Sequence, residues 1–387
     1  MQTTNKRNLA ILGSTGSIGR QTLDVVEEYP DLFRAWLLVA NRSADLLIKQ
    51  ALKFKPEHVV IADDKYYGKV CEALSPLGIG VHSGASAIAE IVTAPEIDTV
   101  VTAMVGYSGL APTINAIKSG KKIALANKET LVVAGELINR LLKSSTSKLY
   151  TIDSEHGAFY QCLIGEKRQA VSKLILTASG GPFRTWTKQD IDNATLEDAL
   201  KHPKWNMGSK ITIDSATMMN KGFEMLEARW LFGVAPDDIE IVVHPQSIVH
   251  SMVEFVDGSV KAQLGLPDMH LPIRFALGLP DRLPSNCKKL SVSDYATLTF
   301  EKPDFEKFPL LDTAYGAAHA GGNVPCAMNA ANEIAVGAFL NGKIKFTDIY
   351  RIIEKSLAEN EYIKSPEYED YVETNAEIRK FATTLIN

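Results

Sequence analysis

A strand, a glycine-rich turn and a helix are expected in succession near the start of the chain, in the segment NLAILGSTGSIGRQTLDVV. Gly13, Gly16 and Gly19 stand in the turn with the spacing G-x-x-G-x-x-G. Glycine permits a tight turn and a close backbone approach, and the N-terminus of the following helix attracts phosphate. The pattern therefore predicts the first βαβ unit of a dinucleotide-binding sheet. A Walker-type loop is excluded, because no Lys-Ser or Lys-Thr follows the last glycine.

Strand and helix patterns keep alternating through the first 150 residues. The apolar runs that predict strands are NLAILG, AWLLVA, HVVIA, TVVTAM and KIALAN. The segments with helical apolar spacing are RQTLDVVEEY, SADLLIKQALKF and APTINAIKSG. This order is typical of an α/β domain with a doubly wound, Rossmann-like parallel sheet.

The pattern changes after residue 150. VSKLILTASGGPF, EIVVHPQSIVHSMVEF and SVKAQLG alternate as the strands of a mixed sheet do, and the segments after about residue 300 are helical. We expect a nucleotide-binding domain at 1–150, an α+β domain at 151–280, a linker at 281–305 and a helical bundle at 306–387. Paired glycines near residue 180 and an aromatic end at Trp205 suggest a lid at about 180–208, although an ordinary surface loop would carry the same signals.

Composition narrows the classes of partner. The net charge of -5 gives no reason to expect nucleic acid, because a protein that binds the phosphate backbone normally carries a basic face. Four widely separated cysteines form no C-x-x-C pair, so reduced thiols are expected. No apolar run approaches the length of a membrane span. We expect a soluble, cytoplasmic protein without a membrane partner.

The end of the second strand bears on the choice of cofactor. An NAD site often places an acid there to bind the ribose 2'-hydroxyl. This chain has Asn41, Arg42 and Ser43 instead. A guanidinium and a hydroxyl suit a 2'-phosphate, so the sequence favours NADPH.

The segment IDSEH, residues 152–156, gathers acids directly after a strand-like run. If the chain stays extended here, Asp153 and Glu155 point to the same side of the strand. Two adjacent carboxylates repel unless a cation or a shared proton lies between them. A solvated strand end is the plainer alternative, and a third ligand is needed to favour a metal.

A predicted helix at 217–231 supplies that third ligand. Asn220 and Glu224 share one face of it with Lys221 beside them, and Ser215 lies close to its start, where an anion binds best. The alternative to a metal ligand here is a Lys-Glu pair on the solvent-exposed surface of the helix. Together with Asp153 and Glu155, Glu224 would form an all-carboxylate site, which suits Mg²⁺ or Mn²⁺ better than zinc.

Several longer motifs resemble the 1-deoxy-D-xylulose 5-phosphate reductoisomerase family. They are GSTGSIG, ANKETLV, DSEH, SGGPFR, HPKWNMG, DSATMMNKGFEMLEARWLF, VHPQSIVHSMVEFVDGSVKAQLG and NAANEIAVGAFL. The resemblance spans essentially the whole chain. It implies an enzyme, usually a homodimer, that makes 2-C-methyl-D-erythritol 4-phosphate for non-mevalonate isoprenoid synthesis with NADPH and a divalent metal.

The resemblance also implies the site residues and a catalytic, metal-binding and dimerisation role for 151–280. The expected metal ligands are Asp153, Glu155 and Glu224. The expected substrate contacts are Lys128, Ser154, Glu155, Ser179, His202, Ser215, Asn220, Lys221 and Glu224. The expected cofactor contacts are Thr15, Gly16, Ser17, Ile18, Asn41, Arg42, Ser43, Asn127, Glu129 and Gly208. Many members carry Gly-Lys-Asn at positions 41–43. This chain therefore has an arginine guanidinium where those members have a lysine ammonium.

The implied reaction shifts a carbon and then reduces an aldehyde with hydride, which requires a Lewis acid and a proton-transfer group. Lys128 and Glu155 are both candidates for the proton transfer, and the sequence leaves the choice open. Two other functions fit parts of the chain. A metal-assisted NADP-dependent dehydrogenase would explain the turn and the acids, but not the cluster of Ser215, Asn220 and Lys221. A nucleotide-sensing binding protein would explain only the first 150 residues.

Overall fold

A computed structural model describes residues 6–205 and 207–386, and the chain divides into two compact units. The first unit is formed by Met1–Thr130, Ile138–Asp153 and Met269–Cys287. The second is formed by Leu131–Leu137, Ser154–Asp268 and Lys288–Asn387. Asn206, within the predicted lid, lies outside the described residues. The domain boundaries expected from the sequence remain a prediction.

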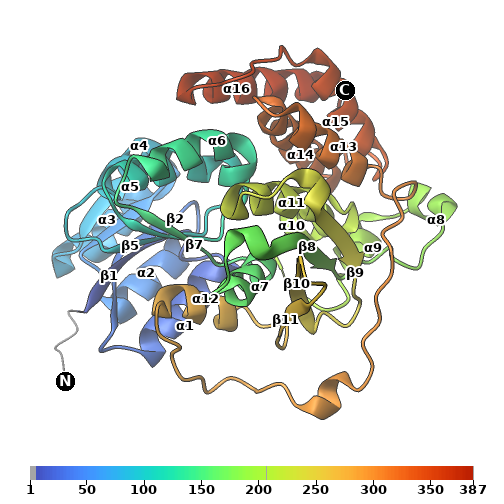
Figure 1. The fold of residues 1–387 in the computed structure, drawn as a ribbon. Helices are drawn as coiled ribbons and strands as arrows, with labels where there is room; N and C mark the ends of the chain where they lie inside the picture. The colour runs from blue at the N-terminus through green and yellow to red at the C-terminus, as the bar shows by residue number, and fades with distance from the viewer. Residues whose placement is uncertain (1–5, 206, 387) are drawn as a thin grey trace. The chain divides into compact units, whose positions relative to one another are not determined.

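The first unit is built on a seven-stranded sheet with the order β4-β3-β2-β1-β5-β6-β7, in which all neighbouring strands are parallel (Figure 1). Its strands are β1 (Arg7–Leu12), β2 (Phe33–Ala40), β3 (His58–Ile61), β4 (Gly80–Ser83), β5 (Thr99–Thr102), β6 (Lys122–Leu125) and β7 (Lys148–Thr151). The predicted doubly wound sheet is confirmed. The sequence missed β4, whose residues GVHS are all half-buried and include only one strongly apolar side chain.

Helices cover this sheet. They are α1 (Ser17–Glu28), α2 (Ala44–Phe54), α3 (Tyr67–Leu74), α4 (Gly84–Ile91), α5 (Leu110–Lys118), α6 (Glu129–Lys143, partly in the second unit) and α12 (His270–Gly278). The last of these comes from far along the chain, yet Ile273, Ala276 and Leu277 belong to the same buried cluster as Leu9. Arg274 also pairs with Glu28 of α1 at 2.7 Å. This unit therefore depends on sequence well beyond residue 150.

A smaller, mixed sheet organises the second unit, with the order β11-β10-β8-β9. Its strands are β8 (Val171–Ala178), β9 (Ile239–Val243), β10 (Val249–Phe255) and β11 (Val260–Leu264). β8 pairs parallel with β9, whereas β10 is antiparallel to β8 and β11. The mixed direction expected from the sequence is confirmed.

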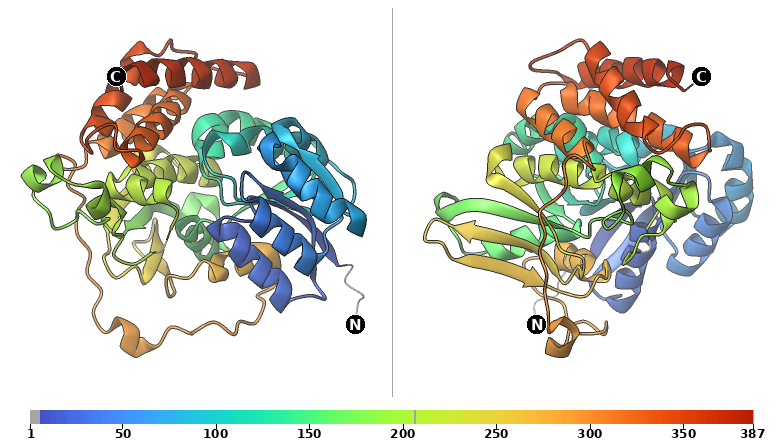
Figure 2. Two further views of the ribbon diagram at one scale, coloured as in Figure 1. Left: turned by 180° about the vertical axis from the view of Figure 1, so that it is seen from behind. Right: turned by 90° about the vertical axis from the view of Figure 1, so that its right-hand side faces the viewer.

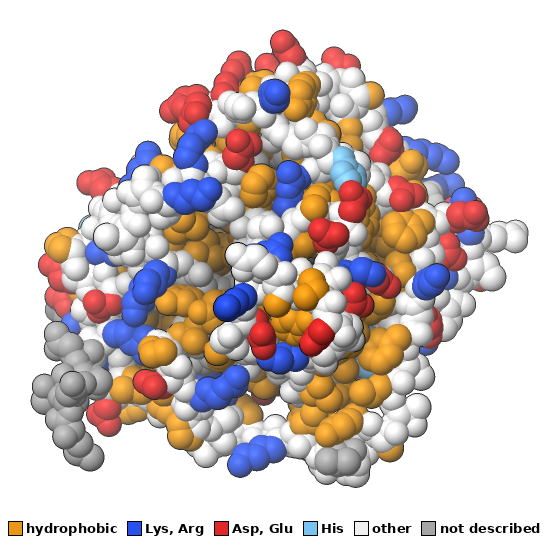
Figure 3. Space-filling view, in the orientation of Figure 1, with side chains coloured by type: hydrophobic (Ala, Val, Ile, Leu, Met, Phe, Trp, Pro, Cys, Tyr) orange, Lys and Arg blue, Asp and Glu red, His pale blue; other side chains and the backbone are white. Residues whose placement is uncertain are grey.

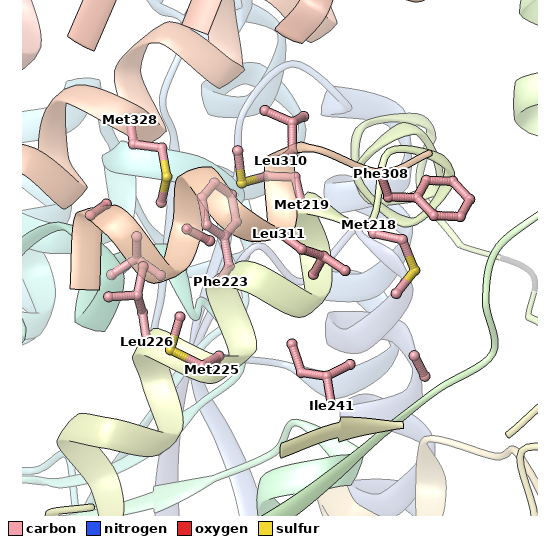
Figure 4. Close-up of a cluster of buried hydrophobic side chains, with 14 of the residues drawn as sticks. Met218, Met219, Phe223, Met225, Leu226, Ile241, Phe308, Leu310, Leu311 and Met328 are labelled. Atoms are coloured by element: carbon pink, nitrogen blue, oxygen red, sulfur yellow. The ribbon is translucent and has the colours of Figure 1, made fainter. Parts of the chain in front are cut away.

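The helices of the second unit include the predicted C-terminal bundle (Figure 2). They are α7 (Ser154–Leu163), α8 (Lys188–Asp192), α9 (Leu196–Leu200), α10 (Ser209–Ala216), α11 (Met219–Phe232), α13 (Leu310–Ala320), α14 (Val324–Leu340), α15 (Asp348–Glu359) and α16 (Tyr368–Thr384). Phe223 and Leu226 of α11 pack in one buried cluster with Leu310 and Leu311 of α13 (Figure 4). The bundle thereby continues the core on which α11 rests.

The predicted helix at 217–231 differs from the observed one in two respects. It begins at Met219, because Met218 adopts a left-handed φ of 62° that separates α10 from α11. It also has no solvent-exposed face over most of its length, since Lys221, Glu224 and Glu227 are buried together with the apolar residues. The exposed Lys-Glu pair that was the alternative interpretation is therefore wrong.

On the surface, Lys and Arg side chains are interspersed with Asp and Glu on the face drawn in Figure 3. Within the described part of the chain, no helix is both long and apolar enough to cross a membrane.

Candidate functional site

The glycine-rich turn is shaped by close backbone contacts. Gly13 has a φ of 88°, and a Cβ there would lie 2.5 Å from the carbonyl oxygen of Ala103. A Cβ on Gly19 would lie 2.2 Å from the carbonyl oxygen of Gly13. Both distances are too short for a side chain, so glycine at these positions is required by the fold of the turn.

The N-terminus of α1 follows this turn. Gly16 is its N-cap, and Gly16 has no side chain that could cap the helix. The first N–H groups of the helix are thus left for another acceptor, next to the predicted cofactor contacts Thr15, Gly16, Ser17 and Ile18. Ser14 and Gln50 exchange two hydrogen bonds of 2.8 Å that fix the turn to α2. The turn is thus held in place for an anion.

Arg42 and Ser43 lie at the edge of the sheet where β2 ends. The Arg42 Nε donates to Asp63 Oδ2 at 3.2 Å, and 74% of the arginine side chain is exposed. Ser43 is the N-cap residue of α2 and is exposed together with Asn41. The three residues present a cation and a hydroxyl at the carboxyl ends of the strands, where doubly wound sheets bind ligands.

Asn127 and Glu129 have different surroundings. The Asn127 Nδ2 donates to the carbonyls of Met104 (2.5 Å) and Gly106 (2.9 Å), and its Oδ1 accepts from Thr130. This side chain holds the loop before α6, so its contact with a cofactor remains a prediction. Glu129 is buried at the start of α6. Gly208 is the N-cap of α10 in the second unit, whereas the other predicted cofactor contacts belong to the first.

The segment IDSEH does not continue the strand. β7 ends at Thr151 and α7 begins at Ser154, so the segment does not stay extended, and Asp153 and Glu155 do not share one side of a strand as they would in an extended chain. Asp153 precedes the helix, and its carboxylate pairs with the Lys128 ammonium at 2.5 Å, both side chains being nearly buried. Glu155 lies in the first turn of α7.

Glu155 and Glu224 share one cation. The Lys221 Nζ lies 2.9 Å from Glu155 Oε1 and also contacts Glu224 Oε2. The Asn220 Nδ2 donates to Glu224 Oε1 at 2.5 Å, and the Ser154 hydroxyl donates to Glu155 Oε2. The structure therefore brings five of the predicted site residues together from α7 and α11.

Burial alone would lower the pKa of Lys221. The Glu155 and Glu224 carboxylates more than offset this effect, so its pKa is raised. The ammonium is consequently charged at neutral pH.

A second polar group joins Ser179, His202 and the end of α10. Backbone N–H groups of Lys204 and Trp205 donate to His202 Nδ1, so the neutral ring carries its proton on Nε2 and donates to Ser179 Oγ at 3.0 Å. Ser179 Oγ also accepts from the Gly181 N–H at 3.3 Å. With both acceptor positions of the hydroxyl used, its own proton is available for an anionic oxygen.

Gly181 connects this group to Ser215. It has a φ of 66°, and a Cβ there would lie 2.6 Å from the Ser215 carbonyl oxygen. The tight approach places the loop after β8 directly against the C-terminal end of α10. Ser179 and Ser215 are thus held on neighbouring segments.

Burial, and secondarily the charge of Lys221, lowers the pKa of His202 to about 4. Burial also lowers the pKa of His250, whose ring lies 6.3 Å from that of Trp205. Both imidazoles are therefore neutral at pH 7.

One buried pair, His156 with Glu227, was not predicted from the sequence. His156 Nδ1 lies 3.3 Å from Glu227 Oε2, and His156 Nε2 lies 2.8 Å from the Glu224 carbonyl oxygen. Both side chains are essentially inaccessible to solvent. They tie α7 to the turn of α11 that carries Glu224. The spacing of Glu224 and Glu227, three residues apart on one helix, was the available signal.

Three family models match the chain. They describe 1-deoxy-D-xylulose 5-phosphate reductoisomerase at residues 9–135, its C-terminal domain at residues 149–232, and a DXP reductoisomerase C-terminal domain at residues 264–381. Proteins named 1-deoxy-D-xylulose 5-phosphate reductoisomerase match over nearly the full length. That of Bacteroides fragilis is 55% identical over 386 residues, with 100% of each chain covered. That of Porphyromonas gingivalis is 57% identical over 381 residues, with 98% of each chain covered.

Solved structures agree with these sequence matches. The chain is similar to a reductoisomerase from Zymomonas mobilis in complex with NADPH, with a TM-score of 0.91, 42% identity, and 99% of this chain and 100% of that chain covered. It is also similar to a DOX-P reductoisomerase in complex with NADPH, fosmidomycin and magnesium, with a TM-score of 0.94, 40% identity and 98% of each chain covered.

Proposed function

The chain belongs to the 1-deoxy-D-xylulose 5-phosphate reductoisomerase family, and from this premise we propose how its own residues carry out the reaction of the family. The enzyme rearranges and reduces 1-deoxy-D-xylulose 5-phosphate to 2-C-methyl-D-erythritol 4-phosphate in non-mevalonate isoprenoid synthesis. It uses NADPH and a divalent metal. The alternatives of a simple dehydrogenase and a nucleotide sensor are thereby set aside.

NADPH binds to the first unit in this proposal. The N–H groups at the start of α1 bind its pyrophosphate, because Gly13 and Gly19 let the backbone come close and the helix dipole favours the negative charge. Arg42 turns from Asp63 to the 2'-phosphate, and the Ser43 hydroxyl donates to the same group. An exposed arginine loses little by this exchange, since surface ion pairs contribute at most about 1 kcal/mol.

Asp153, Glu155 and Glu224 are the proposed metal ligands. Their carboxylates already pair with ammonium groups, Asp153 with Lys128 and both glutamates with Lys221. A set of three hard carboxylate donors fits Mg²⁺ or Mn²⁺. Asp153 directly precedes Ser154, so chain connectivity keeps it close to Glu155. When bound, the metal supplies Lewis-acid polarisation of neighbouring keto and hydroxyl oxygens of the substrate.

The phosphate of the substrate binds to the second polar group. Ser179 and Ser215 donate hydroxyl protons, Asn220 donates from its amide, and Lys221 supplies the charge. His202 acts on the phosphate through Ser179, whose hydroxyl it orients by donating from Nε2. A bound phosphate fixes the position of the reacting carbons relative to Glu155 of α7.

Proton transfer is assigned to Lys128 or Glu155. Lys128 is nearly buried beside Asp153, and Glu155 accepts from Ser154 and Lys221. Glu155 can take the substrate hydroxyl proton directly, whereas Lys128 can do so only after its ammonium has given up a proton. The predicted lid at about 180–208 would exclude water from the aldehyde before hydride transfer.

The assembly and the compartment are part of the same proposal. Homodimerisation is proposed on the resemblance to the family and is tested by sedimentation of the native chain. Four free thiols at Cys71, Cys162, Cys287 and Cys326 support a reducing compartment such as the cytoplasm.

The pairing of Lys221 with Glu155 and Glu224 is the observation that carries this proposal. The test is NADPH oxidation by the native chain with 1-deoxy-D-xylulose 5-phosphate and Mn²⁺, with NMR of the product. We expect a rearranged carbon skeleton, and no turnover after chelation of the metal.

Glu224→Gln should lower kcat/KM about a thousandfold, because a metal ligand supports several kcal/mol of transition-state stabilisation. The control is Glu240→Gln, which removes a half-exposed glutamate paired with Lys173. Equal activity of the Glu224→Gln and Glu240→Gln variants would refute the ligand assignment. An unrearranged product would refute the reaction.

A further inference from the structure

Lys221 occupies an unexpected position for a residue that binds a phosphate. Its ammonium bridges Glu155 of α7 and Glu224 of α11, at 2.9 Å from the first and in contact with the second. The lysine side chain is 6% exposed and that of Glu224 is 2% exposed, so solvent hardly screens the pair. The two carboxylates are those that the proposed function assigns to the metal.

Lys221 is also connected to the segment that carries Ser215. After burial, the charge of the Lys221 ammonium also lowers the pKa of His202, whose ring donates to Ser179. The backbone N–H of Lys221 donates to the Met218 carbonyl oxygen at 3.0 Å, and the backbone N–H of Met218 donates to the Ser215 carbonyl oxygen at 3.2 Å. Lys221 is therefore joined to Glu155 and Glu224 through its ammonium and to the turn after Ser215, another residue that the proposed function assigns to the phosphate, through its backbone.

We propose that Lys221 is an internal counter-ion that alternates between two sets of partners. Without a divalent cation it neutralises Glu155 and Glu224. With the cation bound, those carboxylates are neutralised by the metal, and Lys221 moves to the phosphate. This inference rests on the proposed function and adds that metal and phosphate binding are coupled through one side chain.

The coupling has a definite sign. A phosphate stabilises the state in which Lys221 has left the glutamates, and a metal stabilises the same state. Each ligand must then strengthen the binding of the other by the same factor, since a coupling free energy is reciprocal. Typical couplings of this kind amount to between about 5-fold and 150-fold in affinity.

The test measures Mn²⁺ binding by electron paramagnetic resonance, with the full chain and inorganic phosphate as the anion. A protein-free titration corrects for manganese phosphate complexes. For the native chain we expect saturating phosphate to lower the Kd for Mn²⁺ about tenfold. An unchanged Kd would overturn the proposal.

Lys221→Met isolates the role of the ammonium. Without the competing charge, Mn²⁺ should bind about tenfold more tightly than to the native chain in the absence of phosphate, and phosphate should change that affinity less than about twofold. Native affinity together with native coupling in this variant would also overturn the proposal. Lys221→Gln, which retains a hydrogen-bond donor for the carboxylates, is the second variant should Lys221→Met fail to fold.

Two further variants separate the possible failures. Lys210→Met removes a partly buried lysine of the same unit, one that pairs with Asp214 at 2.9 Å, and it should retain native Mn²⁺ binding and coupling. Glu224→Gln should lose Mn²⁺ binding. If it does while Lys221→Met behaves as the native chain, the coupling is wrong and the ligand assignment stands. If Glu224→Gln binds Mn²⁺ normally, the proposed metal site itself is wrong.

Discussion

The turn before α1 and the polar group between α7 and α11 represent two ways of preparing a site for a charged ligand. The turn uses backbone: its glycines leave no room for a Cβ, and its donors are peptide N–H groups. The polar group uses side chains, and its two glutamates are held by the Lys221 ammonium. The first site should therefore be sensitive to added volume, and the second to lost charge.

The largest effect is expected for Lys128→Met. Loss of the ammonium removes a proposed proton-transfer group and leaves Asp153 without its partner at 2.5 Å, so kcat should fall by about 10² to 10⁴. Steady-state NADPH oxidation measures the change. Lys121→Met is the matched control, because Lys121 is similarly buried but donates to the Ala94 carbonyl oxygen. Near-native turnover of Lys128→Met would assign the proton transfer to Glu155.

A volume change should affect the turn more than a charge change would. Gly19→Ala places a Cβ 2.2 Å from the Gly13 carbonyl oxygen, and we expect this clash to cost about 1–3 kcal/mol of stability and to weaken NADPH binding about tenfold or more. Fluorescence titration with NADPH and urea unfolding measure the two effects.

Gly68→Ala provides the comparison for this variant. Gly68 also lies in the first turn of a helix, α3, but nothing lies within 4 Å of its added Cβ. The substitution should stabilise the chain by up to about 1 kcal/mol through helix propensity alone. If both alanine variants behave alike, the steric account of the turn is wrong.

A smaller effect is expected at the sheet edge beside β2, where a charged side chain, Arg42, is proposed to bind the same cofactor as the backbone of the turn. Arg42→Met should weaken NADPH binding about tenfold while leaving NADH binding unchanged, because a single charge-assisted contact to the 2'-phosphate is lost. Arg34→Met, which removes another ion pair of the first unit, with Glu57 at 2.9 Å, should change neither affinity. An equal loss for NADPH and NADH would show that Arg42 does not read the 2'-phosphate.

The smallest effect concerns the pH dependence of stability. The folded pKa of His202 is lowered to about 4 by burial and by Lys221, below its ordinary value of 6.5. Between these values the unfolded chain binds a proton that the folded chain does not, so His202 lowers stability as the pH falls from about 6.5 to 4. In His202→Asn, the pH dependence of the unfolding free energy should be smaller by the equivalent of up to about one proton. Urea unfolding at pH 7 and pH 5 measures this difference. A native slope in the variant would contradict the buried, neutral imidazole.

The two sites also differ in how far the sequence predicts them. The turn is local: strand, glycines and helix are contiguous, so the pattern of Gly13, Gly16 and Gly19 contains its whole geometry. The pairing of Lys221 with Glu155 joins residues 66 positions apart, and nothing in either segment indicates which carboxylates the ammonium selects. Long-range packing decides that choice.

Two errors have the same physical origin. Asp153 and Glu155 were expected on one strand because the preceding run is strand-like, but α7 begins at Ser154. For α11, an exposed Lys-Glu pair was kept as an alternative interpretation, because Lys and Glu are rarely buried unless paired. In both segments, partners on distant elements determine the local conformation or burial, and single-sequence patterns do not contain that information.

The contribution of α12 to the first unit has a consequence for synthesis of the protein on the ribosome. Ile273, Ala276 and Leu277 complete a core whose other members, such as Leu9 and Val25, emerge more than two hundred residues earlier. The nucleotide-binding sheet therefore cannot complete its core when its own strands have been synthesised. Its apolar surface stays exposed until α12 has been translated, after much of the second unit. A gene fragment that ends at residue 150 should accordingly yield an aggregation-prone product, whereas co-expression of a peptide spanning Met269–Cys287 should restore soluble protein.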